Sequence, residues 1–284
     1  KLGVFVAGYS VSILVWLISW TLIGDANWWL TLLNRFVPFL FVPMLVMLGW
    51  AVYSRRFKLI TSLLIPLLIF AQLYHPYLFP RFANQNKSER TLTVMTYNVL
   101  FSNSDYEAVT NVILNYRPDV VALQEVQPTM MSELERRLGD EYPYSSMGSQ
   151  NDYGTTAVFS RQPIIESSIL DLQADRPAVV VKIEMDNQEF TFVAVHLLAY
   201  NLWWTEPKDI PATVIERTFN QNRQVEVILE QLKAENGTVI LGCDCNSYET
   251  ASSYRLLEDS LTNSARSLGW NPFQPKPNGV NIDN

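Results

Sequence analysis

The stretch VILGCDCN, residues 239–246, is the part of the chain from which its fold is best derived. Its aliphatic half is typical of a short strand that is buried on both faces. Asp244 and Asn246 follow, and side chains two residues apart on an extended chain point to the same side. A carboxylate beside an amide at the carboxyl end of a core strand lies where open α/β sheets bind ligands. Asp and Asn at a strand end also commonly start turns. Whether these two residues form a ligand site or only a turn therefore has to be judged from the motifs upstream.

Charge divides the 284-residue chain into two unlike parts. Residues 1–81 contain six Lys and Arg and one Asp, whereas residues 82–284 contain fifteen Lys and Arg and twenty-seven Asp and Glu, a net charge near −12. The acidic part lacks the cationic surface on which loose attraction to nucleic acid depends. It remains compatible with a polyanionic substrate that is bound through a metal cation.

The two cysteines of the chain, Cys243 and Cys245, flank Asp244. Cysteines two positions apart on an extended strand cannot easily meet the geometry of a disulfide. Only two histidines are present to complete a zinc site. We therefore expect both cysteines to be small buried hydrophobic residues, and their presence assigns no cellular compartment.

Residues 1–82 are predicted to form a transmembrane region with three helices, at about 4–23, 36–53 and 59–80. Each segment is free of Asp, Glu, Lys and Arg. About twenty such residues cross a hydrocarbon core that is roughly 30 Å thick. Prolines occur inside the segments, but proline is tolerated in spanning helices.

Three basic residues, Arg55, Arg56 and Lys58, lie between the second and third predicted spans. The positive-inside rule places them in the cytoplasm, so that the third span exits to the periplasm or the exterior. We therefore predict an integral protein of a bacterial-type inner membrane or plasma membrane. Residues 83–90 form a polar linker, and residues 91–284 form a domain outside the cytoplasm.

The outer domain begins with a predicted strand–helix–strand unit. Residues 91–99 alternate as a strand does and reach Asn98 near their end. Ser104 and Glu107 fit a capping box at the start of a helix, and the next apolar strand ends at Glu125. A glutamate there is unusual unless it is paired or binds a cation. The alternative is an exposed residue near the first turn of the next helix.

A histidine ends a second predicted strand pair. Residues 178–184 and 189–195 form a hairpin around Asp186 and Asn187, and His196 follows its second strand. A lone histidine on an apolar strand is more often a core residue than a ligand. His196 is, however, the only histidine of the outer domain.

Three aromatic residues are candidates for substrate binding. Tyr153 precedes a strand and could donate to a phosphate oxygen, although packing is the commoner role of a lone tyrosine. Trp203 and Trp204 lie on a loop bounded by prolines. They could rest on the membrane interface or stack on a substrate, and ordinary packing explains them equally well.

Five short motifs occur at strand ends in one order: Tyr97-Asn98-Val99, Gln124-Glu125-Val126, Val195-His196-Leu197, Gly242 to Asn246, and Ile282-Asp283. Together they resemble the endonuclease/exonuclease/phosphatase superfamily, which includes deoxyribonuclease I and neutral sphingomyelinases. The resemblance covers roughly residues 91–284. It implies a four-layer α/β sandwich, in which helices flank two packed mixed sheets, and it implies nothing about the predicted spans.

The resemblance also implies a metal site. Glu125 would bind the divalent cation, with Asn98 beside it at the metal–phosphate site and Asp283 close by. The cation would be Mg²⁺, with Mn²⁺ as a possible substitute. Magnesium prefers hard oxygen ligands, and it neutralises charge that develops on phosphoryl oxygens.

The resemblance assigns the remaining roles to His196, which contacts the phosphate, to Asp244, which orients or activates the attacking water, and to Asn246, which holds the phosphate. Two departures from the family pattern are visible. One residue is inserted between Gly242 and Asp244, and the closing Ser-Asp-His motif is missing, because the sequence stops after Asp283-Asn284. We expect the chain as given to be truncated at its C-terminus and inactive by itself, and the complete protein to carry that motif.

The leading prediction is a membrane-anchored, magnesium-dependent phosphodiesterase that acts outside the cytoplasm by in-line attack of water on phosphorus. Its partners would be the bilayer and a phosphate-ester substrate, either a lipid headgroup or a nucleic acid, and no protein partner can be inferred. A headgroup is favoured because the anchor holds the site near lipid. The alternatives are an extracytoplasmic nuclease of the same fold and a non-catalytic anchored binding domain. Retention of Asn98, Glu125, His196, Asp244 and Asn246 together argues against the second alternative.

Overall fold

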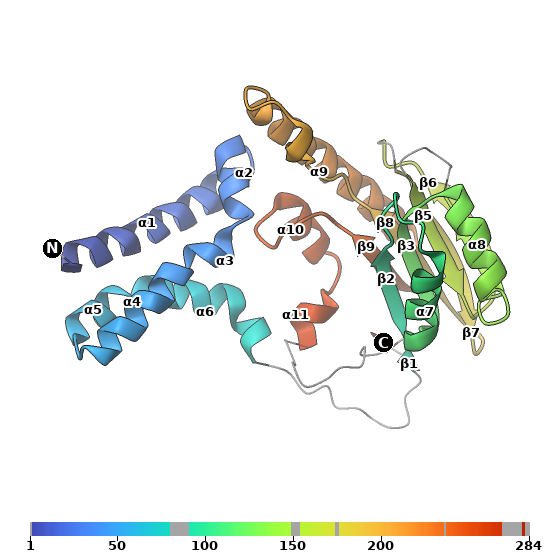
Figure 1. Cartoon of the computed structure of the whole chain (residues 1–284), viewed down its shortest axis with the longest axis horizontal. Helices are drawn as coiled ribbons and strands as arrows, with labels where there is room; N and C mark the ends of the chain where they lie inside the picture. Colours follow the sequence, from blue (N-terminus) through green and yellow to red (C-terminus); the bar gives the residue numbers. More distant parts are fainter. Residues whose placement is uncertain are drawn as a thin grey trace. The chain divides into compact units, whose positions relative to one another are not determined.

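The computed structural model describes residues 2–79, 91–148, 154–173, 176–235, 237–268 and 280–281. The chain forms two compact units, and its elements are labelled in Figure 1. The helical unit comprises Lys1–Asn84, Asn201–Thr218 and Tyr248–Phe273. The sheet unit comprises Gln85–Tyr200, Phe219–Ser247 and Gln274–Asn284. Of the linker predicted at residues 83–90, no part lies within the described residues.

The helical unit contains fewer membrane-spanning candidates than the sequence predicts. Helix α1 (Leu2–Ile23) is the one described helix that is by itself long and apolar enough to cross a membrane. Helices α2 (Trp28–Asn34), α3 (Val37–Leu40) and α4 (Val42–Tyr53) meet the same criterion only as a pair of segments bent by 76°. Helices α5 (Phe57–Ser62) and α6 (Leu64–Leu78) do not meet it. The prediction of three spanning helices is therefore not supported.

Proline explains why the second and third predicted spans are broken. A proline has no N–H to donate to the carbonyl four residues earlier. Pro66 thus leaves the carbonyl of Ser62 without its helical partner, and α5 ends at that residue. The hydroxyl of Ser10 on α1 donates to Ser62 O instead, at 2.6 Å. Pro43 likewise lies in the first turn of α4. The absence of charge in a segment does not reveal such breaks.

The exterior of the helical unit is apolar. Large hydrophobic side chains on three of its helices are mostly exposed, among them Val4, Leu22, Val46 and Leu68. Exposed apolar surface of this extent is rare on water-soluble proteins. The unit also contains the 3₁₀ helix η1 (Leu202–Trp204), the first residues of α9 (Ile210–Ala234), α10 (Ser252–Glu258) and α11 (Ser264–Leu268).

The sheet unit contains two four-stranded mixed sheets. The first has the strand order β2-β3-β5-β4 and consists of β2 (Val94–Asn98), β3 (Val120–Val126), β5 (Thr155–Ser160) and β4 (Tyr144–Met147). The second has the order β6-β7-β8-β9 and consists of β6 (Ile164–Leu170), β7 (Ala178–Met185), β8 (Gln188–His196) and β9 (Thr238–Asp244). Strand β1 (Thr91–Leu92) pairs separately with β10 (Val280–Asn281). Each four-stranded sheet has one parallel pair, β2–β3 or β8–β9.

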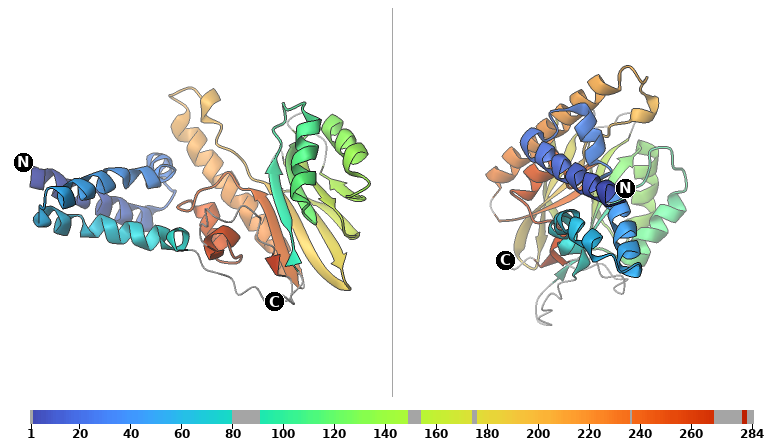
Figure 2. Two further views of the ribbon diagram at one scale, coloured as in Figure 1. Left: turned by 60° about the horizontal axis from the view of Figure 1, so that its bottom comes forward. Right: turned by 90° about the vertical axis from the view of Figure 1, so that its left-hand side faces the viewer.

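The two sheets pack face to face with helices outside them (Figure 2). Helices α7 (Tyr106–Tyr116) and α8 (Pro128–Leu138) cover the first sheet, and the later part of α9 lies along the second. Gly242 on β9 allows the sheets to approach closely, since a Cβ there would lie 2.8 Å from that of Ala122. The predicted arrangement of two mixed sheets flanked by helices is confirmed.

Local predictions in the sheet unit are largely confirmed. The hairpin forms between β7 and β8, and Asp186 and Asn187 at its turn have positive φ angles of 54° and 66°. Such angles are characteristic of a two-residue hairpin turn of type I′. The predicted capping box at Ser104 is wrong. The N-cap of α7 is Asp105, whose side chain accepts the hydrogen bond from Ala108 N.

Candidate active site

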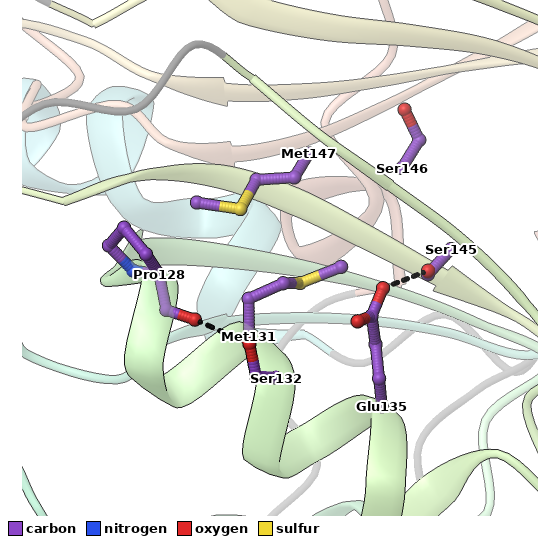
Figure 3. Close-up of a pocket in the computed structure, with 7 residues that line it drawn as sticks. All are labelled: Pro128, Met131, Ser132, Glu135, Ser145, Ser146 and Met147. Carbon is purple, nitrogen blue, oxygen red and sulfur yellow. Dashed lines mark hydrogen bonds between the residues drawn. The ribbon is translucent and has the colours of Figure 1, made fainter.

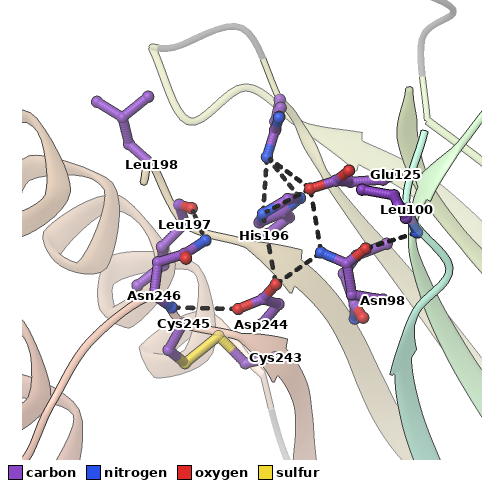
Figure 4. A network of polar contacts seen from close by, with 12 residues as sticks. Asn98, Leu100, Glu125, His196, Leu197, Leu198, Cys243, Asp244, Cys245 and Asn246 are labelled. Carbon is purple, nitrogen blue, oxygen red and sulfur yellow. Dashed lines mark hydrogen bonds and ion pairs between the residues drawn. A yellow bond between two sulfur atoms is a disulfide. The ribbon is translucent and has the colours of Figure 1, made fainter. Parts of the chain in front are cut away.

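Four of the predicted site residues meet at the carboxyl ends of the two parallel strand pairs. Asn98 ends β2, and Glu125 follows the position with which Asn98 pairs on β3. His196 ends β8 and pairs directly with Asp244, which ends β9. Because the two sheets pack with β3 over β8 and β2 over β9, these ends come together (Figure 4). The assembly of Asn98, Glu125, His196 and Asp244 is called the polar cluster below.

The backbone turns sharply at Glu125 to direct its side chain into the cluster. Its φ angle is 63°, a left-handed conformation that is uncommon for a residue with a side chain. The pairing of β3 with β5 is irregular at this point. Gly154 makes room for the distortion, since a Cβ on it would lie 2.6 Å from the carbonyl carbon of Glu125. The side chain of Glu125 is 13% exposed, so it is not the exposed first-turn residue of the alternative interpretation.

The amide of Asn98 links the two acids of the cluster. Its Nδ2 donates to Glu125 Oε1 at 3.1 Å and to Asp244 Oδ2 at 2.8 Å. Its Oδ1 accepts from Leu100 N at 2.9 Å, which fixes the orientation of the amide. The second oxygen of Glu125 accepts from Phe101 N at 3.0 Å. Asn98 therefore holds two carboxylates, from different sheets, in one site.

His196 is buried against both acids and against an arginine that the sequence did not reveal. Its Nε2 lies 3.8 Å from Glu125 Oε1 and 3.6 Å from Asp244 Oδ2. Arg176 Nη1 lies 2.7 Å from both imidazole nitrogens. Burial, followed by the Arg176 cation, lowers the pKa of His196 to about 4, against the opposing effect of the two acids. The imidazole is thus neutral at pH 7, and only one of its nitrogens can accept a hydrogen bond from Arg176.

Arg176 adds a cation at the edge of the cluster. It lies just before β7, and its Nη1 is 3.8 Å from Glu125 Oε1. Sequence reasoning missed it because its position depends on the tertiary path of a loop and not on a strand end. The only local signal is a basic residue followed by proline in a strongly acidic domain.

The cluster fits a magnesium ion that is held by few protein ligands. With His196 neutral, two carboxylates and one guanidinium leave a net charge of about −1 on the cluster and Arg176. Mg²⁺ is typically bound through one or two carboxylates, with water and substrate oxygens as its other ligands. Glu125 and Asp244 provide such oxygens. Among the described residues, no three His, Cys, Asp or Glu side chains are arranged to enclose a metal ion.

The turn after β9 differs from the extended chain expected there. Asn246 has a φ angle of 45°, and its N–H donates to Asp244 Oδ1 at 3.3 Å, which is the turn that the alternative interpretation favours. Asn246 still lies beside the site, where its Nδ2 donates to Leu197 O at 3.0 Å (Figure 4).

The two cysteines form a disulfide, which corrects the prediction that both are buried thiols. Their Cα atoms are 5.1 Å apart, within the range that a disulfide requires. The prediction was wrong because it assumed an extended chain through Cys245, whereas the strand ends at Asp244. Both residues are only partly buried.

The remaining predicted residues are not brought into the cluster by the described part of the structure. Tyr153 and Asp283 lie outside the described residues. Trp203 and Trp204 lie on η1 in the helical unit and are 96% and 91% exposed. Substrate binding by these aromatic residues and metal binding by Asp283 stay predictions.

A separate pocket of about 300 Å³ lies between α8 and β4 (Figure 3). It is lined by Pro128, Met131, Ser132, Glu135, Ser145, Ser146 and Met147. Its one carboxylate, Glu135, accepts from the hydroxyl of Ser145 at 2.9 Å. No residue of the polar cluster lines it, so it is not part of the candidate active site.

Comparison with known proteins identifies a family. Residues 95–282 match the model of the Endonuclease/Exonuclease/phosphatase family, and this range contains the whole polar cluster. No protein with curated function matches the sequence significantly.

Solved structures resemble the chain only distantly. A humanised D. rerio TDP2 with 14 mutations has 18% sequence identity and a TM-score of 0.46, over 64% of this chain and 68% of that one. SmcL has 17% identity and a TM-score of 0.48, over 59% and 68%. Sphingomyelinase C from Streptomyces griseocarneus has 21% identity and a TM-score of 0.46, over 60% and 70%. At this distance none of them indicates a substrate.

Proposed function

Because the chain belongs to the endonuclease/exonuclease/phosphatase family, a family of hydrolases, we propose that it is a divalent-metal-dependent phosphodiesterase that is anchored in a membrane and acts outside the cytoplasm. The observation that carries the proposal is the meeting of Asn98, Glu125, His196 and Asp244 at the ends of two packed parallel strand pairs.

Each residue of the polar cluster has a chemical role in this proposal. Asp244 accepts a proton from the attacking water, and its orientation is fixed by the amide of Asn98 at 2.8 Å. Neutral His196 donates to a phosphoryl oxygen, while the guanidinium of Arg176 offsets the charge that develops on that group. Glu125 would hold the metal with Asn98 beside it, and the metal would supply charge neutralisation at the phosphoryl group.

Membrane anchoring is proposed from α1 and from the apolar exterior of the helical unit. Only 22% of the apolar window of α1 is buried, whereas a core helix of a soluble protein is mostly buried. An amino-terminal apolar helix of this length also occurs in secretion signals. The exposed apolar side chains on α4 and α6 favour an anchor, because a signal sequence would not need them.

Two features support a site outside the cytoplasm. The short basic segment of Arg55, Arg56 and Lys58 is of the kind retained on the cytoplasmic side of a membrane. The disulfide between Cys243 and Cys245 is stable in oxidising compartments and rare in the cytoplasm. Proteolysis of intact spheroplasts tests the location, because a sheet unit in the cytoplasm would be protected until the cells are lysed.

Within this class, we propose a lipid-headgroup diester as the substrate, because the anchor keeps the enzyme at a membrane and the acidic sheet unit lacks a cationic track for nucleic acid. Exposed Trp203 and Trp204 would rest at the membrane interface.

Metal removal tests the reaction. The full-length protein should hydrolyse bis(p-nitrophenyl) phosphate in Mg²⁺, lose that activity in EDTA, and regain it when Mg²⁺ or Mn²⁺ is added in excess. Vesicles that contain sphingomyelin or phosphatidylinositol phosphates, compared with single- and double-stranded DNA, then identify the substrate class. Activity that is unchanged by EDTA would contradict metal dependence, and faster turnover of DNA than of any lipid would contradict the headgroup assignment.

A further inference from the structure

Helix α9 has two buried glutamines, Gln221 and Gln224, each 1% exposed. They are three residues apart, so they lie on the same face of the helix. Burial of a primary amide costs free energy unless its polar atoms are hydrogen-bonded. The partners of these two side chains therefore indicate why glutamine occupies both positions.

Both glutamines bind the backbone just after His196. Gln224 Oε1 accepts from Leu198 N at 2.9 Å, and Gln221 Nε2 donates to Leu198 O at 3.0 Å. Leu198 is two residues beyond His196 and is labelled beside Leu197 in Figure 4. The segment that follows β8 is thus attached to α9 at two successive peptide groups.

Gln221 also reaches the segment that follows Asp244. Its Nε2 lies 3.3 Å from Cys245 O and 3.3 Å from Asn246 O. Asn246 is in a left-handed conformation, which a residue with a side chain keeps only when its surroundings hold it there. One amide therefore contacts both segments that continue from the parallel strands β8 and β9.

We propose that Gln221 is a positioning residue of the phosphodiesterase site. Gln221 holds the two strand ends in register, so that the imidazole of His196 and the amide of Asn246 face the same phosphoryl group. The hydrogen bonds described above join both glutamines to backbone groups, so the proposed effect on the polar cluster passes through the backbone. The inference rests on the proposed function. In-line displacement at phosphorus loses rate steeply when the participating groups are displaced by about 1 Å, so a residue that only positions them affects kcat.

The two glutamines have opposite hydrogen-bonding roles, which provides a matched test. Gln221 acts through its N–H groups, whereas Gln224 acts through its oxygen, and Gln224 Nε2 has no hydrogen-bond partner in the described part of the chain. Gln221→Glu replaces a donor with an oxygen that faces three carbonyl oxygens. Gln224→Glu keeps the acceptor for Leu198 N. The same substitution, one turn apart on one helix, should therefore have different effects.

The test measures kcat, KM and the unfolding midpoint of the full-length protein, with bis(p-nitrophenyl) phosphate in Mg²⁺. Gln221→Met and Gln221→Glu should lower kcat by about 10- to 100-fold while KM changes by less than about threefold. Gln224→Glu should stay within about threefold of the wild type in kcat. Gln231→Met on the same helix is the control. The amide of Gln231 donates to Glu235 Oε1 at 2.9 Å, and Glu235 belongs to neither of the two segments that Gln221 contacts. If Gln221→Met does not fold, Gln221→Asn, which keeps a shorter amide, takes its place.

The possible results separate a positioning role of Gln221 from a purely structural one. A Gln221 variant with a lower unfolding midpoint but unchanged kcat would overturn the inference, because the role would then be structural alone. Equal losses in Gln221→Glu and Gln224→Glu would also overturn it. A wild-type protein without phosphodiesterase activity would overturn the proposed function and the inference together. An active wild type that is indifferent to Gln221 would overturn only the inference.

Discussion

The helical unit and the sheet unit each contain an Asp–Asn pair, and the two pairs differ in their surroundings. In the helical unit, Asn34 Nδ2 lies 3.5 Å from Asp25 Oδ1. In the sheet unit, Asn98 Nδ2 lies 2.8 Å from Asp244 Oδ2. In both cases a side-chain amide donates a hydrogen bond to a carboxylate. The residue types alone therefore do not distinguish a structural site from a catalytic one.

The partners of the Asp25 pair are neutral groups from both side chains and the backbone. Asp25 Oδ2 accepts from Ser252 N at 2.6 Å, and Asn34 Oδ1 accepts from Trp16 Nε1 at 2.9 Å. The carbonyl of Asn34 accepts from the hydroxyl of Thr250 at 2.9 Å. The network joins the ends of the apolar helices to the start of α10, and each of these bonds pairs one donor with one acceptor.

The Asp244 pair is surrounded by other charged or titratable groups. Glu125, His196 and Arg176 all lie within 4 Å of one another or of Asp244. Two carboxylates that share a single amide repel each other, which costs stability and is acceptable only where a cation or a substrate is bound. An accumulation of titratable groups, more than burial or hydrogen bonding, therefore marks the candidate active site.

The largest expected effect follows from neutralising an acid of the cluster. Asp244→Asn and Glu125→Gln should each reduce kcat/KM by roughly 10³-fold or more, because a proton acceptor or a metal ligand is lost. The unfolding midpoint should stay the same or rise, since repulsion between the two acids is removed. Steady-state kinetics and thermal unfolding of the full-length protein measure both quantities.

Glu166→Gln serves as the control for that prediction, because Glu166 pairs with Lys182 on the surface of the second sheet and lies outside the cluster. It should leave kcat/KM unchanged. If Asp244→Asn and Glu125→Gln also leave kcat/KM unchanged, the cluster is not the active site, and the Asp244 pair is structural like the Asp25 pair.

The sequence predicts most of the sheet unit because strand patterns are local. Alternation over residues 91–99 and the apolar run before Glu125 locate β2 and β3, and parallel pairing then brings their ends together. The broken helices were missed for a related reason. Hydropathy measures composition, whereas the break before Pro66 depends on a single missing N–H group.

The site was predicted only where its residues lie at strand ends. Asn98, Glu125, His196 and Asp244 have such positions, whereas Arg176 enters from a loop whose course depends on the whole fold. The sequence also contains a signal for Gln221 and Gln224. They share the helical spacing of the apolar residues Val225 and Ile228, and a polar residue on a buried stripe usually has a specific partner.

A smaller effect, on stability alone, is expected at the structural pair. Asp25→Ala leaves Ser252 N and Asn34 Nδ2 without their acceptor and should lower the free energy of unfolding by about 2 kcal/mol. Asp25→Asn keeps one acceptor oxygen and should lower it less. The folded fraction of either variant should retain wild-type kcat. Thermal unfolding in detergent micelles, followed by kinetics corrected for the folded fraction, measures the two effects separately.

A loss of kcat in folded Asp25→Ala as large as that in Asp244→Asn would contradict the distinction between the two pairs. It would mean that the start of α10 participates in the reaction, although its contacts within the helical unit are purely structural.

The smallest expected effect concerns the disulfide beside Asp244. A Cys243→Ser/Cys245→Ser variant opens a ring with a sequence separation of two, so chain entropy predicts a loss of only roughly 1.5 kcal/mol. Asp244 also remains held by the bond from Leu197 N to its carbonyl at 3.0 Å and by the amide of Asn98, so kcat should fall by no more than about threefold. Chemical denaturation and kinetics under oxidising conditions, with the wild type in reducing agent as a second comparison, measure both. A loss of kcat near that of Asp244→Asn would show that the covalent bridge, and not the hydrogen-bond network, orients the acid, and the sheet-unit pair would then differ from the Asp25 pair in covalent structure as well as in charge.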